Sequence, residues 1–150
     1  MRAVVWRVKS ASCTVEGRTT GKIDNGLMVF LGVGQEDSQK DAEILAKKIA
    51  FMRIFCDENG KKNLSVLDVD GRALVISNFT LYADCTHGRR PNYMFAGAPD
   101  IANELYEYFC KCLENNGIPD IQKGVFGAAM TLDPICDGPV TIILDSKDFM

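Results

Sequence analysis

The spacing of the apolar residues changes at residue 38, and this change most constrains the fold. Residues 2–15 are rich in Val, Trp and Thr, and "LMVFLGV" at 27–33 is a continuous apolar run that predicts a central, buried strand. After Ser38 the apolar residues recur at helical spacing instead: Ala42, Leu45, Ala46, Ile49 and Met52. Such a stripe is typical of a helix packed against a sheet.

Turn and capping residues mark where these elements begin and end. "EGR" at 16–18 predicts a turn before a short strand near 18–23. "DNG" at 24–26 predicts a hairpin, because Asn-Gly suits the positive φ angles of a type I′ turn. Ser38 is a favourable helix N-cap, and Asp41 three residues later is an imperfect capping-box partner.

The rest of the chain predicts a second helix and further strands. We expect the helix from about Asp100 to Asn116, ended by Gly117 and Pro119. Its expected apolar face consists of Ile101, Leu105, Tyr108, Phe109 and Leu113. Strands are expected over residues 72–84, 121–124, 127–133 and 139–144. These elements predict one α+β domain over residues 1–150, with a mostly antiparallel sheet and two covering helices.

Composition and charge argue against several classes of protein. The net charge of −3 is not that of a protein coated in positive charge for nucleic acid, although a local basic patch is compatible with it. No apolar run approaches the roughly 20 residues that span a bilayer. The N-terminal residues alternate between polar and apolar, unlike a signal peptide. We therefore expect a cytoplasmic protein with no membrane partner.

The six cysteines do not form a pattern of metal ligands. There is no C-x-x-C pair and His87 is the only histidine, so a zinc site is poorly supported. We expect reduced thiols, several of them small core residues. The chain also lacks a G-x-S-x-G elbow, a P-loop and a dinucleotide fingerprint. Neither a metal nor another cofactor is predicted.

A basic loop is the first candidate for function. "THGRRPNY" at 86–93 contains Arg89 and Arg90, whose guanidinium groups suit phosphates. The alternative is a charged surface turn. His87 in the same loop is more often a solvated group than a base, but a histidine-based nucleophile could be built only around it. In an acidic protein, one basic loop beside a pocket favours binding the end of a nucleic acid rather than its length.

Two further segments are candidates because of their strand-end residues. "SNFTLYAD" at 77–84 places Ser77 and Thr80 around Phe79, where hydroxyls and free backbone N–H groups line a site or form an ordinary turn. "ICDGPVTIILD" at 135–145 has the pattern of a strand but contains Gly138-Pro139. Proline has no N–H for a sheet ladder, so this pair predicts an edge, a bulge or a bend.

Together these segments resemble one family, the D-aminoacyl-tRNA deacylases, also called D-tyrosyl-tRNA deacylases. The similarity extends over nearly the whole chain, through "MRAVVWRV", "GLMVFLGVGQED", "MRIF", "LYAD…GRRP" and "DGPVTIILD". Two motifs define the family, Ser-Gln-Phe-Thr-Leu and Asn-x-Gly-Pro-Val-Thr. Here they are "SNFTL" at 77–81 and "CDGPVT" at 136–141.

The resemblance implies a homodimer with a β-barrel-like core that hydrolyses the ester of D-aminoacyl-tRNA, without cofactor and without DNA as a partner. In the family the Gly-Pro bond is cis and enters the partner subunit's pocket, where it selects substrate chirality; Gly138 and Pro139 match it. The remaining matches are inferred by position only. The pocket and catalytic residues are Ser77, Asn78, Phe79 and Thr80; those near the tRNA end are Phe126, Met130, Arg89 and Arg90; Arg7 supports the Gly-Pro segment.

Two substitutions depart from the family motifs. Asn78 stands where the family has glutamine, and Cys136 stands where it has asparagine. These departures leave two alternatives to a D-aminoacyl-tRNA deacylase. One is the same fold acting on glycyl- or L-alanyl-tRNA. The other is a dimer that binds the tRNA end with weakened or lost catalysis.

Overall fold

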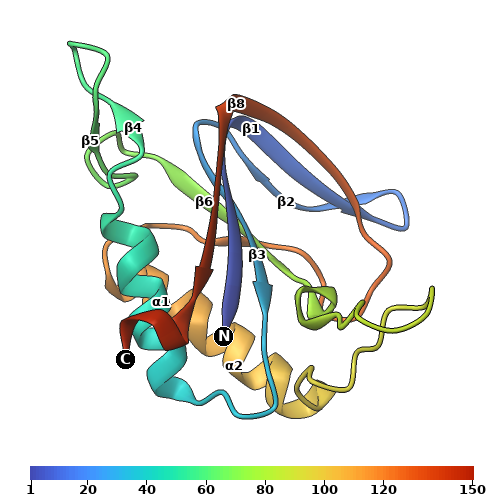
Figure 1. Cartoon of the computed structure of the whole chain (residues 1–150). Coiled ribbons are helices and arrows are strands. Elements are labelled where there is room, and N and C mark those ends of the chain that lie inside the picture. Colours follow the sequence, from blue (N-terminus) through green and yellow to red (C-terminus); the bar gives the residue numbers. More distant parts are fainter.

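The computed structural model describes residues 1–150, and its order of elements is that of an α+β protein (Figure 1). The strands are β1 (Arg2–Val15), β2 (Arg18–Ile23), β3 (Gly26–Gly32), β4 (Phe55–Cys56), β5 (Lys62–Leu64), β6 (Arg72–Ser77), β7 (Gln122–Lys123) and β8 (Thr131–Asp145). The helices are α1 (Gln39–Phe51) and α2 (Pro99–Asn115), with short 3-10 helices η1 (Phe79–Tyr82) and η2 (Ser146–Phe149).

The main sheet has the strand order β2-β1-β3-β6-β7, and β8 pairs with β1. The β1/β2, β1/β3 and β1/β8 pairs are antiparallel, as predicted for most of the sheet. The hairpin predicted at residues 24–26 was wrong, because β2 and β3 both pair with β1 and not with each other, and neither Asn25 nor Gly26 has a positive φ. The β3/β6 and β6/β7 pairs are parallel, so the sheet is mixed. The parallel pairs were not predicted; a helical crossover such as α1, between β3 and β6, lets two strands run in the same direction.

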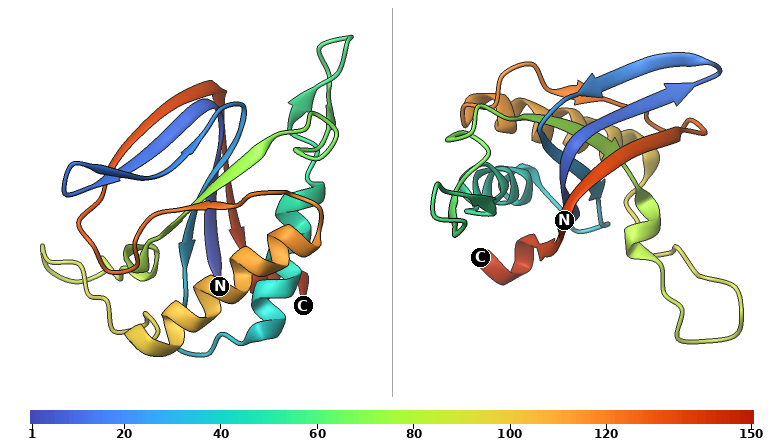
Figure 2. Two further views of the ribbon diagram at one scale, coloured as in Figure 1. Left: turned by 180° about the vertical axis from the view of Figure 1, so that it is seen from behind. Right: turned by 90° about the horizontal axis from the view of Figure 1, so that it is seen from above.

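The sheet curls toward a barrel, as the family resemblance implies (Figure 2). The two ends of the strand order approach each other, because the Lys22 backbone N–H on β2 donates to the Gln122 side chain on β7 at 3.3 Å. Gly21 permits this approach: a Cβ at this position would lie 2.7 Å from the Lys123 carbonyl oxygen. Any larger residue at Gly21 would force the two strands apart.

Strands β3 and β6 are buried on both faces, which explains the continuous apolar run at 27–33. Leu27 and Val29 face the large core between the sheet and the two helices, and Met28 faces a second core on the opposite side of the sheet. On β6, Val75 belongs to the first core and Leu74 to the second. Helices α1 and α2 pack together on the first face (Figures 1 and 2).

Helix α1 begins as predicted. The Ser38 backbone N–H donates to the Asp41 carboxylate at 2.9 Å, which completes a capping box with Asp in place of the usual Glu. The predicted apolar face of α2 is only partly right. Ile101 is 58% exposed, and the buried tyrosine is Tyr106, whereas Tyr108 is partly exposed and donates its hydroxyl to Glu43.

The predicted strands at 127–133 and 139–144 are parts of one long strand, β8, that starts at Thr131. Trp6 pairs with Thr141 and Val8 pairs with Cys136. One residue of β1 therefore faces a stretch of four residues of β8, which contains Gly138 and Pro139. The extra residues of β8 have no partners on β1, and they make β8 bend at the top of Figure 1.

Three smaller points concern the end of β6, the cysteines and the two helices. The strand predicted over 72–84 ends at Ser77, where η1 begins one residue later. All six cysteines are free thiols, as predicted, and three of them are buried: Cys13, Cys110 and Cys112. Neither α1 nor α2 combines the length and the apolar character that crossing a bilayer requires.

Candidate active site

The end of β6, η1, α2 and the segment after β7 enclose a cavity of about 240 Å³. Five residues predicted for the site line it: Ser77, Asn78, Phe79, Phe126 and Met130. The remaining lining residues are mainly apolar and come from β3, α2 and residues 127–128: Leu31, Val33, Ala102, Tyr106, Gly127 and Ala128. The structure therefore gathers most of the predicted pocket residues around one small cavity.

Asn78 shapes the rim of the cavity. The chain leaves β6 at Ser77, and the Asn78 side chain caps η1 by accepting a hydrogen bond from the Thr80 backbone N–H at 3.2 Å. The same Asn78 oxygen accepts a short hydrogen bond from the Thr80 hydroxyl. Thr80 is exposed and does not line the cavity. Its hydroxyl is thus held by an amide, which is not a base.

Tyr106 forms the polar floor of the cavity. Its hydroxyl donates to the Val75 carbonyl oxygen at 2.8 Å, and its ring lies 6.2 Å from the Phe126 ring. Burial raises the pKa of Tyr106, so the phenol stays protonated at neutral pH. No other residue lining the cavity is ionisable, and the cavity therefore contains no side chain suited to act as a general base.

Phe79 and Tyr93 extend the site onto the surface. Phe79 is 57% exposed, and its ring meets that of Tyr93 edge to face at 5.0 Å. An exposed aromatic pair beside an apolar cavity offers a surface on which a flat ring can stack.

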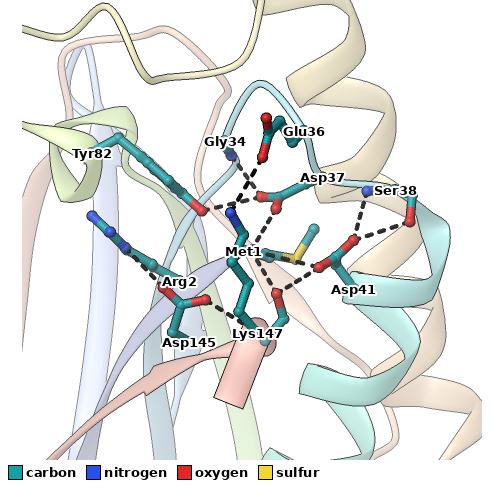
Figure 3. A network of polar contacts seen from close by, with 11 residues as sticks. Met1, Arg2, Gly34, Glu36, Asp37, Ser38, Asp41, Tyr82, Asp145 and Lys147 are labelled. Atoms are coloured by element: carbon teal, nitrogen blue, oxygen red, sulfur yellow. Dashed lines mark hydrogen bonds and ion pairs between the residues drawn. The ribbon is translucent and has the colours of Figure 1, made fainter. Parts of the chain in front are cut away.

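A polar network holds the far end of η1 (Figure 3). The Tyr82 hydroxyl donates to Asp37 at 3.2 Å, and the same carboxylate accepts from the Gly34 backbone N–H at 2.6 Å. The Met1 ammonium also donates to Asp37, at 2.6 Å. Burial, reinforced by the negative charges of Asp37 and Asp145, raises the pKa of Tyr82 and keeps its hydroxyl a donor. Asn78 and Tyr82 thus fix both ends of the helix that presents Phe79.

The Gly138–Pro139 segment forms a second exposed feature, away from this cavity. The peptide bond is cis, and both residues are exposed. Gly138 has φ +138°, and a Cβ at this position would lie 2.6 Å from the Val140 nitrogen, so only glycine fits. Figure 1 shows the bend of β8 at the top and the 3-10 helix after β6 at the lower right.

Arg7 supports the bend from within the protein. This residue is 8% exposed; its Nε donates to the Asp137 carbonyl oxygen at 3.1 Å and its Nη1 to the Ile54 carbonyl oxygen at 2.7 Å. The Asp137 carboxylate also lies 3.3 Å from Nε. One planar guanidinium therefore joins β1, the segment after α1 and the bend of β8.

Comparison with known proteins assigns the chain to a family. The family model described as "D-Tyr-tRNA(Tyr) deacylase" matches residues 4–145. The chain belongs to this family. Proteins named D-aminoacyl-tRNA deacylase from Thermosipho africanus and Koribacter versatilis are each 54% identical to it over 98% of both chains. One from Thermus aquaticus is 51% identical over 99% of this chain and 97% of that protein.

Solved structures of similar proteins agree with the fold. A structure titled "c-Myc DNA Unwinding Element Binding Protein" has a TM-score of 0.91 and 39% identity, and covers 97% of this chain and 98% of that one. A probable eukaryotic D-amino acid tRNA deacylase has a TM-score of 0.80 at 17% identity, over 96% of this chain and 98% of that one. The second likeness shows the fold alone.

The remaining predicted residues lie outside the cavity. His87, Arg89 and Arg90 are exposed in a loop between η1 and α2, and none lines the cavity. Cys136 is exposed on β8 opposite Val8, two residues before the bend. The roles of all these family-matched residues remain predictions.

Sequence reasoning missed the part of the cavity that α2 supplies. Ala102 and Tyr106 line it, and the signal was present in the helical spacing of Ala102, Tyr106 and Phe109. The prediction instead placed Ile101 and Tyr108 on the buried face, which is a rotation of the helix by part of a turn.

Proposed function

We propose that this chain hydrolyses the ester bond of D-aminoacyl-tRNA, releasing the D-amino acid and free tRNA as a proofreading step in translation. The observation that carries the proposal is the cavity at the "SNFTL" motif, in a chain that belongs to the deacylase family. Its volume of about 240 Å³ suits an aminoacyl group and part of a ribose rather than a large ligand. Phe79 and Phe126 provide rings for the terminal adenine.

We propose further that two copies of the chain form each active site. The Gly138–Pro139 bend is exposed and lies apart from its own cavity, so it has no function there. Strand β8 pairs with β1 only, and its side chains Ile135 and Ile143 are 53% and 78% exposed. Exposed apolar side chains on a strand with only one neighbour favour a contact with a second copy, which would carry each bend to the other copy's cavity.

In that arrangement the bend is the chiral filter. Backbone carbonyls at Gly138 and Pro139 would accept hydrogen bonds from the substrate's α-ammonium group. An L side chain would then point into the bend, whereas a D side chain would point away from it. Discrimination by such a clash tolerates many D side chains, and it admits glycine, which has no side chain to exclude. Glycyl-tRNA is therefore a second expected substrate.

The chemistry requires positioning more than acid–base catalysis. The ester of an aminoacyl-tRNA is already activated by its α-ammonium group, and the cavity holds no base. Orienting the ester and a water molecule lowers the barrier. A backbone N–H at Phe79 would stabilise the oxyanion; the N–H of Thr80 is already engaged by Asn78. The 2′-hydroxyl of the terminal ribose can assist in place of a protein base.

Thr80 orients water or substrate in this mechanism and is not a nucleophile. Its hydroxyl donates to Asn78, and no base lies beside it to remove its proton. Thr80→Val should lower kcat by about tenfold, whereas loss of a nucleophile costs on the order of 10⁴-fold or more. If Thr80→Val has no measurable activity and Thr80→Ser is fully active, Thr80 is the nucleophile.

Asn78 is the observation that favours a shifted substrate as the second candidate. Its side chain is committed to capping η1, whereas a longer glutamine would reach farther into the cavity. With the shorter Asn78 side chain, the cavity has more room near the substrate's amino acid. The activity would then extend to esters such as L-alanyl-tRNA.

One assay separates the candidates. The purified protein is incubated with D-tyrosyl-, L-tyrosyl-, L-alanyl- and glycyl-tRNA, and ester loss is followed over time. Rapid loss of the D-tyrosyl ester with little loss of the L esters supports the proposal. Loss of an L ester indicates the shifted substrate, and tight binding without turnover indicates a tRNA-end-binding protein. Sensitivity to EDTA would contradict the metal-free mechanism.

We infer a cytoplasmic location from the substrate, because aminoacyl-tRNA is made and used where translation occurs. We also propose that residues 1–150 act as one domain. The two apolar cores lie on opposite faces of the same sheet, and β3 and β6 contribute to both.

A further inference from the structure

A second pocket lies on the far side of α1, away from the candidate active site. It has a volume of about 570 Å³ and is formed by the exposed face of α1, the residues that follow it, and η2. Its lining residues are Ile44, Lys47, Lys48, Phe51, Met52, Arg53 and Phe149. None of them is acidic, so three cations and two aromatic rings share one open pocket.

The three cations of this pocket form no ion pair within the chain. Lys47, Lys48 and Arg53 are exposed, and none forms an ion pair with a carboxylate. Other lysines on α2, β7 and η2 do form ion pairs, for example Lys111 with Glu114 at 3.1 Å. The acidic residue one turn before Lys47 is Glu43, whose carboxylate is bound by the Tyr108 hydroxyl at 2.6 Å.

The two aromatic rings of the pocket, Phe51 and Phe149, are exposed to solvent and can contact a ligand. Phe51 is 52% exposed and Phe149 is 37% exposed. The Lys48 ammonium lies 4.8 Å from the centre of the Phe149 ring. Cations that hold phosphates beside aromatic rings that stack on bases are the combination by which proteins bind single-stranded nucleic acid.

The pocket is connected to the Gly138–Pro139 bend by a short chain of contacts. Arg53 is followed by Ile54, whose carbonyl oxygen accepts from Arg7 at 2.7 Å. Arg7 in turn donates to the Asp137 carbonyl oxygen at 3.1 Å, immediately before the bend. The pocket and the bend of one chain are therefore held on the same framework.

We propose that this pocket binds the sugar–phosphate backbone and a base of the unpaired acceptor end of tRNA while the 3′-terminal adenosine occupies the partner subunit's cavity. This inference rests on the proposed function, because it assumes that the bend enters a second copy's cavity. The subunit that supplies the chiral filter would then also hold the RNA leading to the filtered ester. RNA is favoured over an acidic protein because the pocket pairs its cations with exposed rings.

The experiment compares two substrates with the same ester. One is D-tyrosyl-tRNA; the other is 3′-D-tyrosyl-adenosine, which has the ester, ribose and base but no further phosphates. Lys47→Gln/Lys48→Gln should raise KM for the tRNA by about tenfold or more with little change in kcat. It should reduce the slope of log kcat/KM against log salt by about 1.4, since each phosphate contact on a single strand contributes about 0.7. Kinetics on the adenosine ester should not change.

The matched control removes two exposed cations elsewhere. Lys22→Gln/Lys40→Gln lowers the net charge equally, at two exposed and unpaired lysines on β2 and at the start of α1, and should leave KM for tRNA within about twofold of the wild-type value. An equal increase in KM in the control would mean that overall charge, not this pocket, attracts tRNA, and would overturn the proposal. So would an unchanged KM in the Lys47→Gln/Lys48→Gln variant. If the wild-type protein hydrolyses neither ester, the proposed function itself has failed.

A second variant tests the stacking. Phe51→Leu keeps an apolar side chain but removes the ring, and should raise KM for tRNA by about fivefold or more without affecting the adenosine ester. Vesicles containing phosphatidylserine provide the competing surface. Binding of these vesicles that depends on Lys47 and Lys48, with an unchanged KM for tRNA, would assign the pocket to a membrane and overturn the proposal.

Discussion

The cavity at η1 and the bend of β8 are built in opposite ways. The cavity is formed mainly by apolar packing between β6, α2 and the segment after β7, and its polar groups are few. The bend is almost free of packing on its outer side, and its shape depends on one buried arginine, Arg7. The cavity is a recess in the surface, whereas the bend projects from it.

We infer from this difference that neither region is a complete site by itself. The lining of the cavity is mostly apolar, and it contains no charged side chain that could hold the substrate's α-ammonium group. The bend has rigid backbone acceptors but no pocket. Chiral discrimination requires contacts on several sides of one carbon atom, so we infer that the two regions act together across two copies of the chain.

The largest effect is expected from a substitution at the bend. Gly138→Ala places a Cβ 2.6 Å from the Val140 nitrogen at a φ of +138°, and so must displace the bend. Displacement of about 1 Å in a positioning group costs about 100-fold, so kcat/KM for D-tyrosyl-tRNA should fall by at least that factor. Gly60→Ala is the control, because Gly60 also has positive φ but open space around it. An unchanged kcat/KM in Gly138→Ala would remove the bend from the mechanism.

A smaller effect is expected from removing the support of the bend. Arg7→Met leaves the Asp137 and Ile54 carbonyl oxygens without their buried donor, which should lower the free energy of unfolding by about 2–4 kcal/mol. We expect kcat/KM to fall by about tenfold as the bend loosens. Arg72→Met removes a partly exposed arginine paired with the exposed Asp70, and should cost less than about 1 kcal/mol. Equal losses of stability and of kcat/KM in the two variants would show that Arg7 does not support the bend.

On the cavity side, Asn78 is expected to act through the shape of η1. Asn78→Ala removes the cap on the Thr80 N–H and should cost about 1 kcal/mol of stability. Because Phe79 is displaced with η1, kcat/KM should fall about fivefold. Asn78→Asp keeps the acceptor oxygen and should retain the stability. If thermal unfolding shows Asn78→Asp to be destabilised as much as Asn78→Ala, then Asn78 does not stabilise the protein by capping η1.

The smallest effect is expected at the floor of the cavity. Tyr106→Phe loses one buried hydrogen bond to Val75, worth about 1 kcal/mol, and should change kcat/KM less than twofold. The raised pKa of Tyr106 stabilises the fold below the usual tyrosine pKa of about 10, and this stability is lost as pH rises above it. Chemical denaturation between pH 9 and 11 should therefore show a smaller decrease in the free energy of unfolding for Tyr106→Phe than for the wild-type protein. An identical decrease would contradict the raised pKa of Tyr106.

The sequence predicted best those elements that depend on local chemistry. The turn at residues 16–18, the capping box of Ser38 and Asp41, and the long first strand all occur as expected. In each case the signal lies within a few residues along the chain. The collinear family motifs likewise identified Ser77, Phe79 and Phe126, which the structure places around one cavity.

The features that were missed depend on contacts between distant segments. Pairing between β3 and β6 is set by the route of α1 across the sheet, which no local pattern encodes. The burial of Tyr106 rather than Tyr108 depends on the rotation of α2 against α1 and the sheet. The continuity of β8 through Gly138-Pro139 depends on Arg7, 130 residues earlier in the chain, which binds the bend.

Complementation between two inactive variants tests the central claim most directly, that each site combines the cavity of one copy with the bend of another. Gly138→Ala damages the bend, and Phe79→Asp damages the cavity. Each variant alone should be inactive toward D-tyrosyl-tRNA, but an equal mixture, refolded together, should recover about a quarter of wild-type activity, because half of the dimers would contain one intact site. A mixture as inactive as its components would show that the cavity and the bend do not meet across two chains.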